Sequence, residues 1–163
     1  MVGKYLRRAY RDGADMEART AMAYANTLSG FAIAVGVVTI CHALGHAVGG
    51  VSNTTHGRTL AALTVPAMRF SMKHSPDKYG NIGMFLRDEH TKDSQDSLED
   101  SIKEIKKLLQ DIDLLAPLSE QGVEEKDLEA IADGTMRYMD YNLDIDPAKS
   151  TKEDLLAILR EAL

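Results

Sequence analysis

Residues 41–57 read CHALGHAVGGVSNTTHG and contain three of the five histidines of the chain. His42 and His46 are four residues apart, so on a helix their side chains project from the same face, one turn apart. The turn-rich stretch at residues 49–55 then allows the chain to fold back and bring His56 alongside them. Imidazole is the commonest neutral side-chain ligand for zinc, iron and similar divalent metals. The pattern therefore predicts a helical metal site that is poor in carboxylate ligands.

The spacing of the first two histidines does not by itself establish a metal site, because such pairs also occur in ordinary helices as partly buried, hydrogen-bonded side chains. The zinc-protease signature HExxH is absent, since residues 43–45 read ALG and supply no glutamate base. Two features of the surroundings favour a metal. Residues 36–48 are otherwise small or apolar, so an unpaired imidazole would be costly there. Gly45, Gly49 and Gly50 leave room for a close approach to the backbone.

Cys41, the single cysteine of the chain, adjoins His42 and has two interpretations. It can serve as an additional soft ligand or as a small buried apolar residue, and the second interpretation is favoured. A single cysteine excludes an internal disulfide and suits a reducing environment. No targeting signal is visible, and the longest apolar run, at residues 30–41, is 12 residues long and too short to span a bilayer. We therefore expect a cytoplasmic protein that does not enter a membrane.

The charge of the chain is distributed unevenly. Residues 1–86 carry a net charge of +5 and residues 87–163 one of −11, which together give the overall charge of −6. The basic residues Arg7, Arg8 and Arg11 form one small cluster in a chain that is acidic overall. These features argue against a nucleic-acid-binding protein.

Short motifs along the rest of the chain accompany the histidine pattern. They are DMEAR at 15–19, MAYA at 22–25, SGFA at 29–32, HG at 56–57 followed by Leu63, Pro66, Arg69 and Phe70, PDKY at 76–79, LSEQGV at 118–123 with KDL at 126–128, and TKEDLL at 151–156. In this order, and together with HALGHAVGG and TTHG, they resemble the iron-containing (group III) alcohol dehydrogenases over essentially the whole chain. Thr55 stands where that family most often has proline, a change expected to affect the turn and to leave the His56 imidazole in place.

The resemblance implies a fold, a metal and a set of residue roles. Members of that family have an N-terminal α/β domain that binds NAD or NADP and an all-helical C-terminal domain that carries the metal. The metal is usually Fe²⁺, with Zn²⁺ as the alternative, and is held by one aspartate and three histidines. By this resemblance His42 and His56 are metal ligands. His46 is the catalytic residue, which lies near the nicotinamide and the substrate and positions or relays a proton.

Two parts of that family's pattern are not found in the sequence. The upstream Asp-x-x-x-His ligand pair is missing, and no GxGxxG or GxxxxGK[ST] phosphate loop occurs. Residues 1–163 therefore resemble a single domain, the all-helical C-terminal domain without the N-terminal nucleotide-binding domain and without its own first helix. NAD or NADP is expected to bind only with the missing N-terminal domain.

The residue pattern by itself predicts an all-α fold, a multi-helix bundle of roughly six to eight helices. Helices are expected at residues 4–12, at 15–36, around the histidines to 49–50, from 56 onward with Pro66 as a kink or an end, at 98–112, at 124–133, and after a capping box at 150–153. Pro76 and residues 87–95, which include a surface histidine at His90, are expected in loops. The β-branched stretch at residues 35–40 has no second strand to pair with.

The function implied by the resemblance is hydride transfer between a primary or secondary alcohol and NAD(P), so the substrate is a small-molecule alcohol or aldehyde. The chain is expected to be inactive or weakly active without a nucleotide-binding domain or subunit as its partner. The apolar stretch at residues 30–48 needs cover, so a homo-oligomer is also expected. The alternative is a catalytically silent helical domain that is retained for structural association.

Overall fold

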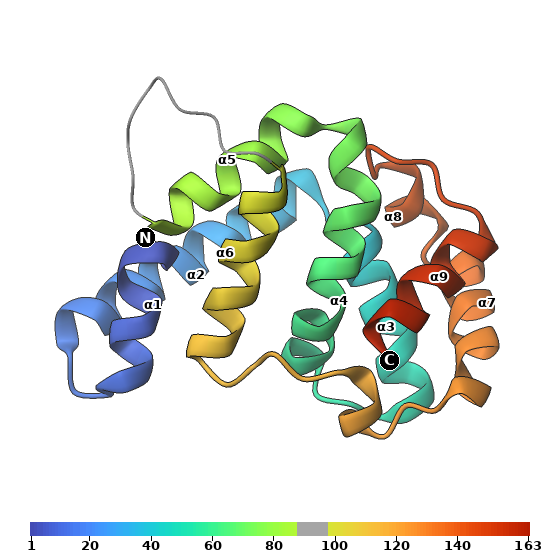
Figure 1. Cartoon of the computed structure of the whole chain (residues 1–163), viewed down its shortest axis with the longest axis horizontal. Coiled ribbons are helices and arrows are strands. Elements are labelled where there is room, and N and C mark those ends of the chain that lie inside the picture. The colour runs from blue at the N-terminus through green and yellow to red at the C-terminus, as the bar shows by residue number, and fades with distance from the viewer. Residues whose placement is uncertain (88–97) are drawn as a thin grey trace. The chain divides into compact units, whose positions relative to one another are not determined.

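The computed structural model describes residues 1–87 and 98–163, and over these residues all regular structure is helical, without a strand. The α-helices are α1 Val2–Arg11, α2 Met16–Gly36, α3 Ile40–Ser52, α4 His56–Ser71, α5 Pro76–Arg87, α6 Leu98–Asp111, α7 Leu128–Tyr138, α8 Asp140–Asp144 and α9 Lys152–Ala162 (Figure 1). Three short 3-10 helices, η1 Met72–His74, η2 Leu118–Gln121 and η3 Glu125–Asp127, connect them. The predicted all-α class is confirmed.

The nine α-helices of the described residues exceed the expected six to eight, because α5 and the short α8 were not predicted. Pro76 was expected in a loop but is the first residue of α5. A proline is tolerated there because the first helical N–H has no partner within the helix. The expected loop at 87–95 and the surface histidine His90 lie outside the described residues, apart from Arg87, which ends α5.

The contacts divide the chain into two compact units, each made of two separate segments. Unit 1 comprises residues 1–37 and 76–113, and unit 2 comprises residues 38–75 and 114–163. The single domain over residues 1–163 remains a prediction. All three histidines of the cluster belong to unit 2, and so do all the residues of the main hydrophobic core.

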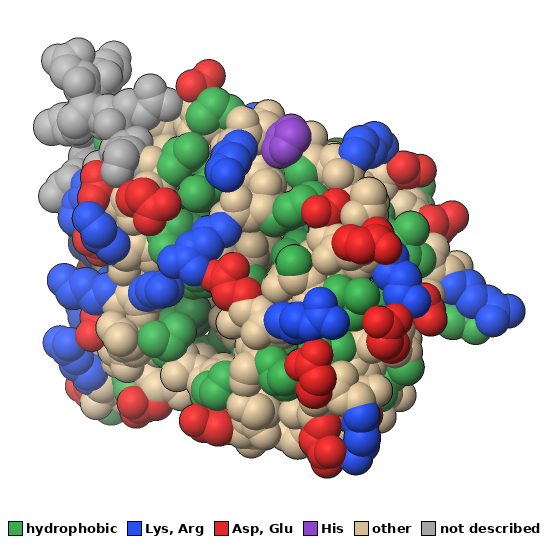
Figure 2. All heavy atoms as spheres, turned by 45° about the vertical axis from the view of Figure 1, so that its right-hand side comes forward, with side chains coloured by type: hydrophobic (Ala, Val, Ile, Leu, Met, Phe, Trp, Pro, Cys, Tyr) green, Lys and Arg blue, Asp and Glu red, His purple; other side chains and the backbone are tan. Residues whose placement is uncertain are grey.

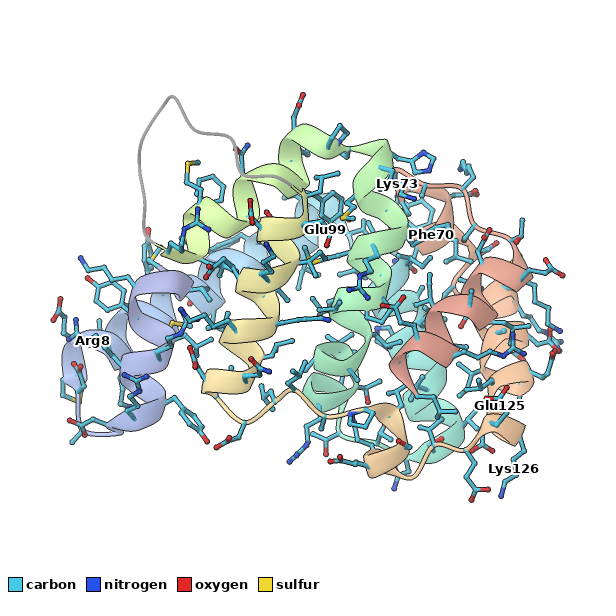
Figure 3. The ribbon with its side chains drawn as sticks, viewed as in Figure 1. Arg8, Phe70, Lys73, Glu99, Glu125 and Lys126 are labelled. Atoms are coloured by element: carbon cyan, nitrogen blue, oxygen red, sulfur yellow. The ribbon has the colours of Figure 1, made fainter. Side chains whose placement is uncertain are left out.

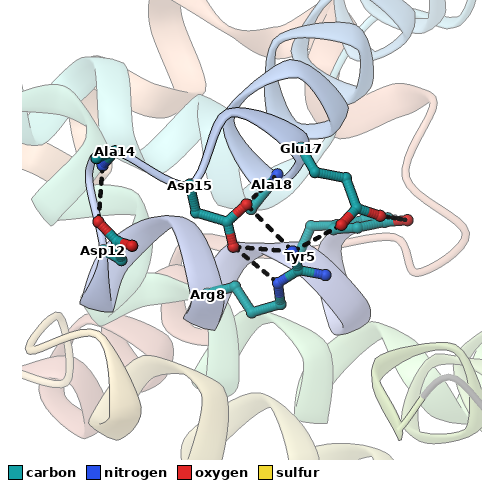
Figure 4. Close-up of polar contacts among 7 residues, drawn as sticks. All are labelled: Tyr5, Arg8, Asp12, Ala14, Asp15, Glu17 and Ala18. Carbon is teal, nitrogen blue, oxygen red and sulfur yellow. Dashed lines mark hydrogen bonds and ion pairs between the residues drawn. The ribbon is translucent and has the colours of Figure 1, made fainter.

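In unit 1, the acidic residues of the DMEAR motif join α1 to the start of α2 (Figure 4). The Asp15 carboxylate caps α2 by accepting a hydrogen bond from the Ala18 N–H at 3.0 Å. The Arg8 guanidinium donates to Asp15 Oδ2 at 2.9 Å and to Glu17 Oε2 at 2.8 Å. The hydrogen bond from the Ala18 N–H lowers the pKa of Asp15 below its usual range, and the hydrogen bond from Arg8 has the next largest effect in the same direction. Tyr5 donates a further hydrogen bond to Glu17, so the motif has a structural role in this hairpin.

Also in unit 1, α6 packs closely on α5 through a buried serine. Ser101 Oγ accepts a hydrogen bond from the Gly83 N–H at 3.0 Å and donates one to the Gly80 carbonyl at 3.3 Å. Gly80 and Gly83 are both buried, so the two helices approach through positions without side chains. The amphipathic helix predicted at 98–112 is confirmed as α6, with Ile102 buried in this contact region.

The core of unit 2 lies among α3, α4, α7 and α9. Both α3 and α9 pack against α4 and against α7 (Figure 1). Phe70 on α4 packs against this core from its edge (Figure 3). The fully buried side chains include Ile40, Leu44, Val48, Leu63, Leu118, Leu128, Ile131, Leu155 and Leu159. These apolar contacts hold in place the helix that carries His42 and His46.

The first turn of α3 is fixed by side chains from residues 139–148. Asp146 is 4% exposed, and its Oδ2 accepts a hydrogen bond from the Ile40 N–H at 3.2 Å. Its Oδ1 accepts from Ser71 Oγ at 2.8 Å and from the Ala148 N–H at 3.0 Å. The residue at the N-cap position itself, Thr39, provides no side-chain cap. A carboxylate distant in sequence therefore caps the histidine helix, where the helix dipole favours negative charge.

Pro66 was expected as a kink or an end of the helix that begins at residue 56, and it does not end α4, which continues to Ser71. The capping box that opens α9 is one residue later than predicted. Thr151 Oγ1 accepts from the Asp154 N–H, and Asp154 Oδ2 accepts from the Thr151 N–H. Both Ser150 with Glu153 and Thr151 with Asp154 have the three-residue spacing of a capping box, so the sequence alone does not distinguish them.

On the face drawn in Figure 2, acidic and basic side chains are interspersed. In unit 2, Lys152 Nζ lies 2.6 Å from Asp133 Oδ1 and 2.8 Å from Glu129 Oε2, and it ties α9 to α7. These two carboxylates raise the pKa of Lys152. Glu125 and Lys126 lie in η3 before α7 (Figure 3), and Arg160 of α9 donates to Glu125 at 3.1 Å. Such exposed pairs contribute little to stability individually.

Residues 37–39 separate α2 from α3. Val37 has φ +61° and ψ −163°, a region that a β-branched residue rarely adopts. The Asn142 amide donates a hydrogen bond to the Val38 carbonyl at 2.8 Å, which holds the next residue in place. No single helix of the described residues is long and apolar enough to cross a membrane, and α2 and α3 reach that length and composition only together.

Replacing Val37 by glycine is expected to raise the free energy of unfolding by about 1 kcal/mol. The positive φ costs valine roughly 1–3 kcal/mol, whereas the greater freedom of glycine in the unfolded chain costs about 0.5–1 kcal/mol. Urea unfolding measures the difference. Val38→Gly is the matched control, because Val38 has no positive φ, and this variant should be less stable than the parent chain. A Val37→Gly chain no more stable than the parent would contradict the prediction.

Candidate metal centre

The structure brings the three predicted histidines together at the junction of α3 and α4. His42 and His46 lie one turn apart on α3, and His56 is the first residue of α4. The ring centroids are 5.5 Å apart for His42 and His56, 5.0 Å for His46 and His56, and 6.4 Å for His42 and His46. Asn53, in the left-handed conformation with φ +53°, ends α3 and reverses the chain. The fold-back expected from the turn-rich stretch is therefore present.

Gly45 allows α4 to approach α3 closely beneath the histidines. A Cβ atom at this position would lie 2.6 Å from Leu60 Cδ2 and 3.8 Å from His56 Cε1. The first contact is too short for a real side chain, so any larger residue would displace Leu60. The absence of a side chain at Gly45 thus helps to set the distance between His56 and the two histidines of α3.

The imidazoles of the cluster lack hydrogen-bond partners among the other described residues. His42 is half-buried, while His46 and His56 are exposed. Burial lowers the pKa of His42, and the neighbouring His56 and His46 lower it further. A neutral imidazole with a free nitrogen lone pair is the form that binds metals.

Two of the three ring separations suit a shared metal ion. Imidazoles that bind one tetrahedral ion at about 2.0–2.1 Å have ring centroids roughly 5 Å apart. The pairs that involve His56 are close to this value, while the His42–His46 pair is wider. Within residues 1–87 and 98–163, no group of three His, Cys, Asp or Glu side chains is arranged to hold a metal ion. The donor set thus fits one part of a metal site, to which further ligands must be added.

The Cys41 side chain contacts residues in the middle of α4. Its Sγ lies 3.8 Å from the Leu60 carbonyl oxygen and 4.0 Å from Thr64 Oγ1. Burial raises the pKa of the thiol to about 11, against a smaller opposite effect of the Thr64 hydroxyl. The side chain also packs against the hydrophobic core. These contacts favour the interpretation of Cys41 as a small apolar residue.

A cavity of about 370 Å³ borders the cluster and was not expected from the sequence. It lies between α3 and α7 and is lined by His46, Ala47, Gly50, Val51, Gly134 and Tyr138, among others. His46 is therefore shared by the histidine cluster and the cavity. The helical spacing of His46 and Gly50 places both on one face of α3, but nothing in the sequence shows that α7 forms the opposite wall.

The whole chain, residues 1–163, matches the model of the Fe-containing alcohol dehydrogenase family, C-terminal. Among its relatives, 1,3-propanediol dehydrogenase of Klebsiella pneumoniae is 31% identical over 99% of this chain and 42% of its own length. Alcohol dehydrogenase 4 of Schizosaccharomyces pombe is 31% identical over 100% of this chain and 37% of its own.

Solved structures agree with the family match. The archaeal halo-thermophilic Red Sea brine pool alcohol dehydrogenase is 32% identical and superimposes with a TM-score of 0.92, over 99% of this chain and 42% of that one. A 1,3-propanediol oxidoreductase gives a TM-score of 0.90 at 28% identity, with the same coverage of both chains. The chain thus spans about two fifths of the length of the relatives that it matches. On the family match over its full length, it belongs to the Fe-containing alcohol dehydrogenase family and corresponds to the C-terminal part of that family.

Proposed function

We propose that this chain supplies part of the catalytic centre of a metal-dependent alcohol dehydrogenase that transfers hydride between an alcohol and NAD(P). His42 and His56 are the metal ligands, and Fe²⁺ is the expected metal, with Zn²⁺ as the alternative. The observation that carries the proposal is the cluster of three unpaired imidazoles at the α3–α4 junction, with ring centroids 5.0–6.4 Å apart. A nucleotide-binding part, as in the family, is needed to complete the enzyme.

Each histidine has a separate task in this proposal. When bound, the metal ion and the nicotinamide supply a Lewis acid for the alcohol oxygen and an acceptor for the hydride. Burial and the neighbouring His56 and His46 lower the pKa of His42, which favours the neutral imidazole that can offer a nitrogen lone pair from the third position of α3. His56 presents its ring from the adjoining end of α4. His46 is exposed beside them, and its ring nitrogen can pass the proton of the alcohol to solvent.

Metal binding by single-histidine variants tests this assignment. The parent chain should bind Zn²⁺ or Co²⁺ weakly and retain less than one equivalent after dialysis, because two imidazoles are half of a usual four-ligand set. His42→Ala and His56→Ala should each weaken binding by roughly tenfold or more. Isothermal titration calorimetry, supported by the visible absorption of bound Co²⁺, measures the affinity.

His74→Ala is the matched control, because His74 is an exposed histidine of the same unit outside the cluster. It should bind metal like the parent chain. Equal affinities in all three variants would refute the assignment of His42 and His56. A parent chain without any metal binding would instead favour the catalytically silent helical domain.

A further inference from the structure

The cavity between α3 and α7 is nearly free of polar groups. Its walls include Ala47 and Val51 of α3. Two of the lining residues, His46 and Tyr138, have side chains that can form hydrogen bonds. No aspartate, glutamate, lysine or arginine lines it. A charged group placed there would lose hydration without gaining a partner of opposite charge. The lining therefore suits a neutral apolar group.

Two glycines create the space. A Cβ atom at Gly50 would meet nothing within 4 Å, and one at Gly134 would lie 3.9 Å from Ala47 Cβ, an ordinary contact. Side chains at either position would therefore be tolerated by the backbone and would project into the cavity or its mouth. Glycine in a helix interior is less favourable than alanine by about 1 kcal/mol. The two glycines that face the cavity therefore leave it open and lower the stability of their helices.

The position of His46 relates this space to the proposed chemistry. The same imidazole borders the cavity and lies 5.0 Å from the His56 ring, centroid to centroid. A molecule whose hydroxyl group lies at the histidine cluster can therefore extend past His46 into the cavity. The volume of about 370 Å³ is ample for a phenyl ring or a medium-length alkyl chain, since an engineered cavity of about 150 Å³ can bind benzene.

We propose that the α3–α7 cavity binds the alkyl or aryl group of the alcohol, so that the substrates are apolar primary alcohols rather than small diols. This inference rests on the proposed function, which places the hydroxyl group of the alcohol at the histidine cluster. A diol would bury its second hydroxyl group mainly against Ala47, Val51 and the glycines, where Tyr138 is the lining residue besides His46 whose side chain can bond it. The nicotinamide ring is a poorer occupant, because no carboxylate lines the cavity to pair with its positive charge.

Methyl NMR of the 163-residue chain tests the cavity without requiring turnover. The methyl groups of Ala47, Val51, Ala130 and Met139 all line the cavity and serve as reporters. Benzyl alcohol and 1-hexanol should shift these signals in a saturable way, with a dissociation constant of roughly 1 mM, as expected for ligands of this size. 1,3-Propanediol should bind at least about tenfold more weakly.

Filling the cavity should abolish this binding. Gly134→Leu is expected to weaken benzyl alcohol binding by about tenfold or more, and Gly50→Leu provides a second blocked variant in case the first fails to fold. Ala157→Leu is the matched control, since Ala157 is exposed on α9 in the same unit. The control should bind like the parent chain. Thermal unfolding verifies that each variant is folded.

Three results would overturn the inference: equal binding of 1,3-propanediol, shifts confined to methyl groups outside the cavity, or unchanged binding in both blocked variants. A metal titration of Gly134→Leu separates this inference from the proposed function. If the blocked variant loses alcohol binding but keeps the metal affinity of the parent, the cavity and the metal ligands are independent, as proposed. If alcohols bind but no metal does, the proposed function fails while the apolar site stands.

Discussion

Asp146→Ala is expected to lower the free energy of unfolding by about 3 kcal/mol, which is a large share of the stability of a small domain. The substitution removes the acceptor for three donors, namely the Ile40 N–H, the Ser71 hydroxyl and the Ala148 N–H. These groups are buried, so water cannot fully replace the carboxylate. The loss falls at the start of α3, and the orientation of His42, two residues later, should become less defined.

Urea unfolding and the histidine ring signals in NMR spectra measure these two effects. Asp146→Asn keeps one acceptor oxygen but turns an amide N–H₂ toward other donors, so it should fall between the parent and the alanine variant. Asp144→Ala is the matched control, because Asp144 is exposed and pairs with Lys149 at the surface. It should change stability by less than about 0.5 kcal/mol. Similar values for Asp146→Ala and Asp144→Ala would contradict the assigned role.

Gly3→Ala is expected to destabilise unit 1 by about 3 kcal/mol. A Cβ atom at this position would lie 2.3 Å from the Leu86 carbonyl oxygen and 2.6 Å from that of Phe85. Both atoms belong to the backbone of α5 and cannot turn aside as a flexible side chain could. The first helix must therefore move away from α5, and the packing between the two helices is lost.

Gly13→Ala is the control for this prediction, because a Cβ atom there would meet nothing within 4 Å. Its effect should be small and of either sign. Amide hydrogen exchange locates the damage, which should appear as faster exchange in α1 and α5 of Gly3→Ala, with the helices of unit 2 unaffected. Unchanged exchange in α1 would show that α1 does not depend on this close approach.

The parts of the fold and the site that rest on short spacings could be predicted from the sequence. The i, i+4 spacing of His42 and His46 needs only helix geometry, and the glycine-rich turn before His56 leads to the observed fold-back. The same holds for α2, which was predicted at residues 15–36 and is observed at Met16–Gly36 with Asp15 as its N-cap. In each case the residues that determine the structure are close together in the chain.

The other features depend on contacts between distant residues, which periodicity does not report. The Asp146 carboxylate is 106 residues from the Ile40 N–H that it caps, and Asp146 lies in a segment with no helical pattern of its own. The second wall of the cavity comes from α7, and the need for glycine at position 3 arises from the backbone of α5. The displaced capping box at α9 was missed for a different reason, because two overlapping pairs of residues offer equal spacing.

The interleaved composition of the two units has a consequence for biosynthesis. The chain passes between them three times, after residues 37, 75 and 113, so unit 1 is complete in the nascent chain before unit 2. The helices that carry the histidines emerge from the ribosome before α7 and α9, which cover their apolar faces. At about 5–20 residues per second, residues 114–163 take several seconds to appear. During that interval the apolar faces of α3 and α4 are open to chaperones and to other nascent chains.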